Sequence, residues 1–286
     1  MALTLGILFG IIAMLSWGVG DFFAAKSVRK TSVFKTYFWI QLIALIIYFV
    51  IFLFFFKLPI ISSIAFVIIL IAAFLGITSV LSYYKGLQIG YVSIISPIGA
   101  SYAVITVILS LIFLNETLTL FQAIAISLVI LGAILASFKF HDLIRLKVKN
   151  IATGVKYAIF AMFAWGVFMI LIDLLVTELG WFLPIFFMVT VEIFYLLTYS
   201  GIAKKNISFP KNVAVFVILA GVLEVIAFLS FGFSITSENV AIVAPIISAF
   251  PAITIILARI FFKEILDLNQ KVGVVVVLIG LVLLAI

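Results

Sequence analysis

The chain has 286 residues, of which 67% are apolar and 9% are charged, whereas a soluble domain is about half apolar and about a quarter charged. Because one membrane crossing takes about 20 apolar residues, this composition predicts an integral membrane protein and excludes a separate soluble catalytic domain. The formal charge of +7 comes from basic clusters between apolar runs, which argues against nucleic-acid binding, and the absence of cysteine excludes disulfides and thiolate metal sites.

Ten apolar runs, separated by charged residues, glycine or proline, predict ten transmembrane helices. The first run has no basic segment before it and is longer than the apolar part of a signal peptide, so we expect it to remain as a span. The ten ranges, in chain order, are 3–25, 36–56, 62–84, 92–114, 119–138, 151–176, 181–203, 213–235, 240–262 and 268–286.

The basic residues predict the orientation of this helical bundle. Every Lys and Arg except Lys57 falls in or beside the first, third, fifth, seventh or ninth connection. Since cytoplasmic loops carry an excess of Lys and Arg, we expect these connections to be cytoplasmic and both termini to lie outside. The expected location is the cell (plasma) membrane.

The two halves of the chain match without a gap when the sequence is shifted by 148 residues, which places Trp17 on Trp165 and Gly18 on Gly166. Polar, proline and glycine positions align too, which indicates an internal repeat. Further aligned pairs are Lys57 with Lys205, Ser82 with Ser230, Pro97 with Pro245, Thr106 with Thr254, Glu116 with Glu264, Gln122 with Gln270 and Gly132 with Gly280. The predicted units are a first five-helix repeat, 1–138, a basic connection, 139–150, and a second five-helix repeat, 151–286. A five-helix unit crosses the membrane an odd number of times, so the second copy must be inverted, which is typical of alternating-access transporters.

These repeated motifs resemble those of the EamA-type family of the drug/metabolite transporter superfamily. Each half has a Trp-Gly in its first helix, a proline early in its fourth, and a glutamate in the turn before its fifth, here Glu116 and Glu264. The resemblance covers the whole chain. It implies a ten-helix carrier of small metabolites, with a central cavity lined mainly by the first, third and fourth helices of each half. Most members keep their termini cytoplasmic, whereas the basic residues here predict the reverse. Each of the two glutamates is expected to favour the dipole of the helix that follows it.

Two glutamates lie near the centres of predicted spans, where ionisable side chains are costly and usually functional. Glu224, aligned with Gly76, lies in the eighth helix, which the resemblance places at the cavity. Its carboxyl can exchange a proton and couple transport to a proton gradient, or hold an amino group; the alternative is a protonated carboxyl that only packs against a neighbouring helix. Glu192 lies in the seventh helix, which the resemblance places at the periphery, and Gln41 is a candidate partner for it.

Aromatic residues and prolines supply further candidates for the cavity wall. Trp17 and Trp165 lie in mid-helix beside glycines, so they either line the cavity as stacking and cation–π surfaces or fill space between the repeats. The prolines free backbone carbonyls, and predict either hinges and a site wall or kinks needed only for packing. The remaining candidates are Pro97, Pro245, Pro251, Tyr83, Tyr102, Phe250 and Ser230.

Two charged residues near helix ends are secondary candidates. Asp21 lies one helical turn beyond Trp17 and is expected to form a gate or a salt bridge, or to be structural. Lys85 ends the third span, where it attracts anions to the cytoplasmic mouth or is an ordinary boundary lysine.

The sequence shows no spacing of metal ligands, nucleotide-binding loop or nucleophile motif, so we expect no metal, no cofactor and no enzymatic activity. The favoured function is a secondary transporter of a small amino-acid-like or other zwitterionic, cationic or neutral solute, working by alternating access, with proton coupling as an option. A non-transporting scaffold or a channel is the alternative. The expected partners are a small-molecule substrate and the lipid bilayer, and the sequence indicates no oligomeric state.

Overall fold

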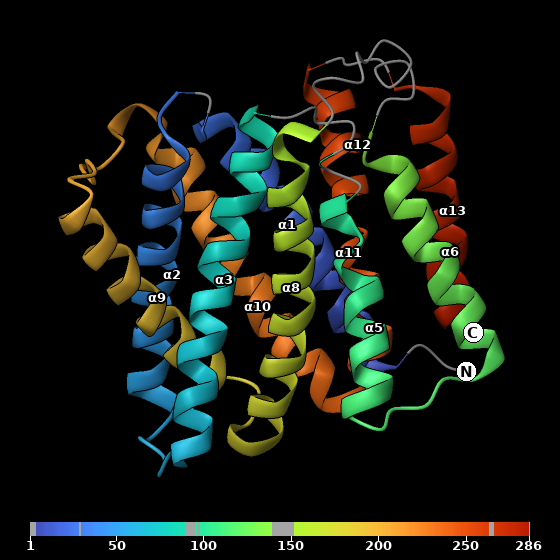
Figure 1. Ribbon diagram of the computed structural model, residues 1–286, viewed down its shortest axis with the longest axis horizontal. Helices are drawn as coiled ribbons and strands as arrows, with labels where there is room; N and C mark the ends of the chain where they lie inside the picture. The colour runs from blue at the N-terminus through green and yellow to red at the C-terminus, as the bar shows by residue number, and fades with distance from the viewer. Residues whose placement is uncertain are drawn as a thin grey trace.

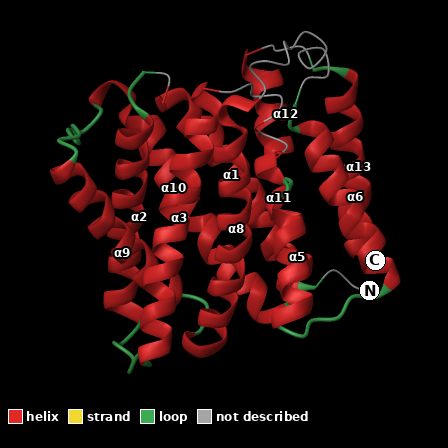
Figure 2. Ribbon diagram, viewed as in Figure 1, coloured by secondary structure: helices red, strands yellow, loops and turns green. Residues whose placement is uncertain are grey.

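The computed structural model describes residues 4–28, 30–89, 95, 98–138, 152–262 and 266–285, and every regular element within these ranges is a helix (Figure 2). The elements in chain order are α1 (Leu5–Val28), α2 (Val33–Phe55), α3 (Ser63–Ile89), α5 (Tyr102–Phe113), α6 (Leu120–Ala136), α8 (Ala152–Leu179), α9 (Leu183–Ile202), the 3-10 helix η2 (Lys211–Val213), α10 (Ala214–Ser237), α11 (Val240–Ser248), α12 (Phe250–Phe262) and α13 (Leu268–Ala285). The predicted all-α class is confirmed.

Helix length and composition support a multi-pass membrane protein. Among the residues that the structure describes, six helices are long and apolar enough to cross a bilayer, namely α1, α2, α3, α8, α9 and the segment that ends in α10. The helices at α5, α6, α11 and α13 are also apolar but shorter. Many outward-facing large apolar side chains are exposed on these helices, as expected for surfaces in contact with lipid. The count of ten crossings stays a prediction.

The predicted ninth span, 240–262, is not one helix, because the chain turns at Ala249 between α11 and α12. The first repeat has the same turn at Ser101, which aligns with Ala249. Matching backbone hydrogen bonds close the two turns: Ala249 N–H to Ile246 O (3.2 Å), Ala252 N–H to Ala249 O (3.0 Å), Ser101 N–H to Ile98 O (3.2 Å) and Val104 N–H to Ser101 O (3.0 Å). Pro251 follows the second turn, whereas the aligned residue of the first repeat is Ala103. The break is therefore a property of the repeat that does not depend on Pro251.

The two repeats are interleaved through their first helices. α1 packs between α10 and the α11–α12 pair, and α8 packs between α3 and α5. A Cβ built on Gly18 would lie 2.5 Å from Ile253 Cβ, and one built on Gly166 would lie 2.6 Å from Ile105 Cβ. Aligned threonines donate to the same glycines, Thr254 Oγ1 to Gly18 O at 2.9 Å and Thr106 Oγ1 to Gly166 O at 3.4 Å. Each repeat thus contacts the other through the same set of close approaches, which only glycine permits.

The repeats run in opposite directions (Figure 1). α1 rises from the lower end of the view, where both termini lie, whereas α8 descends from the upper end. Phe56, after the end of α2, stacks on Phe182, before the start of α9, with ring centroids 4.1 Å apart. At the other ends of these helices, the rings of Phe34 and Tyr199 have centroids 5.4 Å apart, so α2 and α9 are antiparallel. This is the arrangement expected of two inverted units.

Repeated glutamines cap the last helix of each repeat. Thr119 N–H donates to Gln122 Oε1 at 2.9 Å, and Gln122 N–H donates back to Thr119 Oγ1 at 3.2 Å. At the aligned position, Asp267 N–H donates to Gln270 Oε1 at 3.1 Å. The two glutamines therefore satisfy backbone groups at the starts of α6 and α13, as in a capping box.

Glu116 has a different role from the one expected. We expected its carboxylate to favour the helix that follows it, which is α6. Instead it accepts hydrogen bonds from the backbone N–H groups of Val240 and Ala241, both at 2.9 Å, at the start of α11 in the other repeat. Its aligned residue, Glu264, lies outside the described residues. The carboxylate thus joins the repeats at the lower end and complements the dipole of α11.

Candidate functional site

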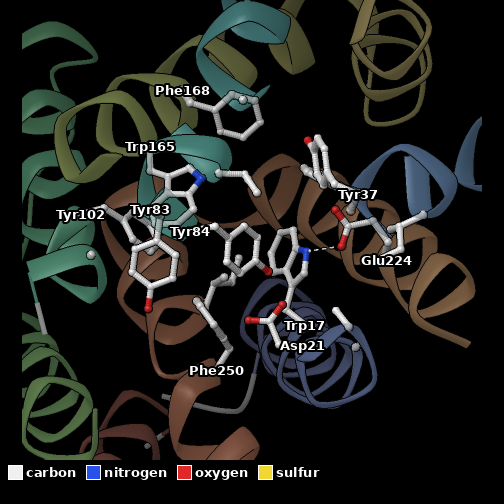
Figure 3. Close-up of a pocket in the computed structure, with 18 of the residues that line it drawn as sticks. Trp17, Asp21, Tyr37, Tyr83, Tyr84, Tyr102, Trp165, Phe168, Glu224 and Phe250 are labelled. Carbon is white, nitrogen blue, oxygen red and sulfur yellow. Dashed lines mark hydrogen bonds between the residues drawn. The ribbon is translucent and has the colours of Figure 1, made fainter. Parts of the chain in front are cut away.

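A central cavity of about 150 Å³ lies between the two repeats (Figure 3). It receives side chains from α1, α2 and α3, from α8, α9 and α10, and from the residues around the two repeat-related turns. The lining residues are Trp17, Gly20, Asp21, Ala24, Tyr37, Ile40, Gln41, Gly76, Val80, Tyr83, Tyr84, Gly99, Ala100, Tyr102, Trp165, Phe168, Met169, Glu192, Ala220, Glu224, Phe228, Ile247, Phe250 and Pro251.

Glu224 stands in one wall of the cavity, where α10 faces α1. Trp17 Nε1 donates to Glu224 Oε2 at 3.1 Å (Figure 3). Asp21 also lines the cavity, from the next turn of α1. The indole of Trp17 packs edge-on against Phe228, with ring centroids 5.0 Å apart. The tryptophan therefore lines the cavity and also positions the carboxyl of Glu224.

A second carboxyl, Glu192, belongs to the same cavity and is almost fully buried, with 2% of its surface exposed. Tyr37 OH donates to Glu192 Oε2 at 3.3 Å, and Gln41 Nε2 donates to Tyr37 OH at 2.9 Å. The suggested pairing of Gln41 with Glu192 is thus indirect, with a tyrosine hydroxyl between them. The expectation that the seventh helix is peripheral is wrong, because Glu192 of α9 lines the cavity together with Tyr37 and Gln41 of α2.

Gly76 explains how Glu192 reaches the cavity. It is the position in the first repeat that aligns with Glu224. A Cβ built on Gly76 would lie 2.5 Å from Glu192 Oε1, so the missing side chain leaves the space that this carboxyl occupies. Each of the two aligned positions therefore has a carboxyl beside it in the cavity. At position 224 the carboxyl belongs to the residue itself, whereas at Gly76 it comes from Glu192 of α9.

The opposite wall is aromatic (Figure 3). Trp165 packs against Tyr83, with ring centroids 5.2 Å apart, and against Tyr102, with centroids 6.0 Å apart. Trp17 and Phe231 repeat the first of these contacts, with centroids 6.2 Å apart, since Phe231 aligns with Tyr83. Such rings offer stacking and cation–π surfaces to a bound solute.

The polar side chains of the cavity have apolar residues at the aligned positions. Asp21 aligns with Met169, which also lines the cavity, and Tyr37 and Gln41 align with Ile185 and Val189. None of the described lining residues is basic. The backbone of the site is close to two-fold symmetric, whereas its charge is not. Glu192 and Glu224 accept hydrogen bonds from Tyr37 and Trp17, and no described lining residue supplies a countercharge.

Several sequence-predicted residues lie elsewhere. Pro245, inside α11, and Ser230 in α10 are buried but do not line the cavity. Lys85 is exposed near the end of α3, away from the lining. Pro97 lies outside the described residues. Trp17, Trp165, Tyr83, Tyr102, Phe250, Glu224, Asp21 and Glu192 all line the cavity.

Sequence reasoning missed Tyr37, Gly76, Phe168 and Phe228 as lining residues. The glycine opposite a glutamate in the repeat alignment was a signal that could have identified Gly76. The other three depend on which helices pack together. Across the described part of the chain, no group of three or more His, Cys, Asp and Glu side chains is placed to hold a metal ion.

These features define the class of protein: a multi-pass helical membrane protein built from two related bundles around a central cavity. The chain belongs to the EamA-like transporter family, whose family model matches residues 4–138 and, separately, residues 152–286. EamA proteins are part of the drug/metabolite transporter superfamily. The recognition made from the repeated motifs is confirmed.

Two further comparisons give one relative in sequence and one in structure. The chain is 35% identical over 133 residues to the uncharacterized protein MJ1333.1 of Methanocaldococcus jannaschii, covering 46% of this chain and 95% of that protein. A solved crystal structure, described only as that of a protein, has a TM-score of 0.81 and 13% sequence identity, covering 99% of this chain and 98% of the other. At that identity the likeness shows a shared fold.

Proposed function

We propose that this protein is a secondary transporter that moves a small amine-bearing solute, a cation or an amino-acid-like zwitterion, through the central cavity by alternating access. The observation that carries the proposal is the charge of the cavity: Asp21, Glu192 and Glu224 line it, and none of its described lining residues is basic. An ammonium group supplies the donors and the positive charge that such a site lacks. The aromatic wall suits the apolar or cationic remainder of the solute.

Glu224 is proposed as the residue that couples transport to protons. A carboxylate that holds an ammonium group cannot hold a proton at the same time, so substrate and proton compete for it. Amine binding is then expected to weaken as the pH falls, and proton binding at one side of the membrane releases the solute there. Trp17 positions the carboxyl through its 3.1 Å hydrogen bond. Neutral sugars are expected to bind weakly and sugar phosphates not at all.

The proposed setting is the cell membrane, with both termini outside. The lower end of the bundle holds both termini (Figure 1), and Lys57 is the one basic residue that the sequence assigns to that side. A cysteine introduced at Ala2 is expected to react with impermeant reagents added outside whole cells. Labelling only from the cytoplasm would overturn this orientation.

Uptake into proteoliposomes tests the function. Radiolabelled amino acids, polyamines, a cationic dye, a sugar and a nucleoside are offered with and without a proton gradient. We expect saturable, gradient-dependent uptake of one amine-bearing class, lost in Glu224→Gln and retained in the control Glu178→Gln, an exposed acid that does not line the cavity.

Other outcomes distinguish the alternatives. Flux that does not saturate indicates a channel, and silence across the whole panel favours a non-transporting scaffold. Full gradient-driven transport by Glu224→Gln at every pH would remove this acid from the coupling step. Uptake restricted to neutral or anionic solutes would contradict the proposed substrate class.

A further inference from the structure

A basic groove lies at the upper end of the bundle and shares no lining residue with the central cavity. Its charged walls are Lys30, from the connection between α1 and α2, Lys35, in the first turn of α2, and Lys205 and Lys211, from the connection between α9 and α10. Figure 1 shows these two connections near one another at the upper left. The groove has a volume of about 580 Å³, and none of its lining residues is acidic.

The two walls belong to different repeats and are tied together. Lys35 Nζ donates to Ser208 Oγ at 2.9 Å. Trp39 Nε1 donates to Ile207 O at 2.9 Å, and its ring packs edge-on against Phe209 with centroids 4.8 Å apart. These contacts fix the 203–210 segment against the start of α2, so the lysines are presented by a formed groove and not by two independent loops.

The chemistry of the groove matches a phosphate group. Its ammonium groups are accompanied by the hydroxyl of Ser32 and the side-chain amides of Asn206 and Asn212, which are further donors for oxyanion oxygens. The groove also lies where exposed apolar surface ends, because Ile202 at the end of α9 is 80% exposed. That boundary is the level of lipid headgroups in a bilayer.

The internal repeat provides a comparison within the same chain. The residues aligned with the four lysines are Glu178, Leu183, Lys57 and Ser63. These positions lie in or directly beside the connections at the opposite end of the bundle and hold one base and one acid. The backbone of the fold therefore does not require a basic cluster at this place, and the charge is specific to one end.

We propose that this basic groove binds a phosphate-bearing anion, namely the headgroup phosphate of an anionic lipid or a free phosphate compound, and that the bound anion bridges the two repeats at this end. Each lysine near an anionic headgroup contributes about fivefold in affinity, the equivalent of about 1 kcal/mol. Removal of Lys205 and Lys211 together is then expected to weaken binding by about 25-fold.

The test uses the purified full-length protein and three forms of it: the wild type, the double variant Lys205→Gln/Lys211→Gln, and the control Lys57→Gln. The control residue aligns with Lys205 and is exposed in the connection at the other end. One arm titrates phosphatidylglycerol, with phosphatidylcholine as the neutral lipid, and follows binding by native mass spectrometry and thermal stabilisation. The other arm titrates inorganic phosphate and glycerol phosphate. Melting in phosphatidylcholine alone verifies that each variant is folded.

A large affinity loss in the double variant but not in Lys57→Gln, seen with phosphatidylglycerol only, supports the groove as a site for a lipid headgroup. The same difference with the soluble phosphates supports it as a site for a free phosphate compound. Equal binding by the double variant and Lys57→Gln in both arms, or no binding by the wild type, overturns the proposal. These outcomes are independent of the transport assay, since no groove residue lines the central cavity.

Discussion

Replacing Gly18 by alanine tests the close contact between α1 and α12. The new Cβ would lie 2.5 Å from Ile253 Cβ and 2.8 Å from Phe250 O, atoms that cannot move without shifting α12. Gly20, on the same helix, is the matched control, because its new Cβ would lie 3.5 Å from Leu223 Cβ, an ordinary contact. Both changes gain about 1 kcal/mol of helix propensity. Only Gly18→Ala also carries the cost of overpacking, about 1 to 3 kcal/mol.

The expected result is that Gly18→Ala is less stable than Gly20→Ala by about 1 to 3 kcal/mol, since the propensity gain is common to both. Reversible unfolding in mixed micelles with increasing dodecyl sulfate, followed by the fluorescence of the four tryptophans, measures this difference. Gly166→Ala, the aligned change in α8, is expected to behave like Gly18→Ala. Equal midpoints for Gly18→Ala and Gly20→Ala would show that α1 and α12 do not pack as described.

Three further changes address other contacts. Glu116→Gln weakens two charge-assisted hydrogen bonds to the start of α11, and we expect it to destabilise the protein by about 1 to 2 kcal/mol. The same unfolding experiment measures this change, and an unchanged midpoint would contradict the contact between Glu116 and α11. Tyr37→Phe removes the hydroxyl between Gln41 and Glu192, with an expected cost of about 1 to 3 kcal/mol, and wild-type stability would argue against this chain of bonds. Gly76→Ala displaces the flexible carboxyl of Glu192, so we expect a small change in stability but altered substrate affinity, and unaltered affinity would exclude Glu192 from the site.

The repeat alignment predicted much of the fold and part of the cavity. Residues that recur after 148 positions, such as Trp17 with Trp165 and Tyr102 with Phe250, were expected at the cavity and line it. The reason is physical: two inverted copies that meet around an axis place aligned positions at equivalent distances from it. Pro245 recurs as well but is buried inside α11 and does not line the cavity, so recurrence alone does not identify a cavity residue.

The contacts between α2 and α9 could not be predicted in this way. Tyr37 and Glu192 are 155 positions apart in the chain, and the helices that carry them are apolar on most of their surface. Hydropathy indicates which segments lie in lipid, but it does not specify which apolar helices pack together there. Small residues and hydrogen bonds decide that pairing. The depth of Glu192 was evident from the sequence, whereas its access to the cavity required Gly76 to be placed beside it.

The symmetric backbone and the asymmetric charge of the cavity have different consequences. The reciprocal contacts at Gly18 and Gly166 pack the two repeats against each other in the same way, and the proposed alternating access needs two conformations that are similar in free energy. Each added contact at one end shifts that balance. Glu116 joins the repeats at the lower end, where it accepts hydrogen bonds from the backbone of α11, and the proposed anion in the basic groove would join them at the upper end.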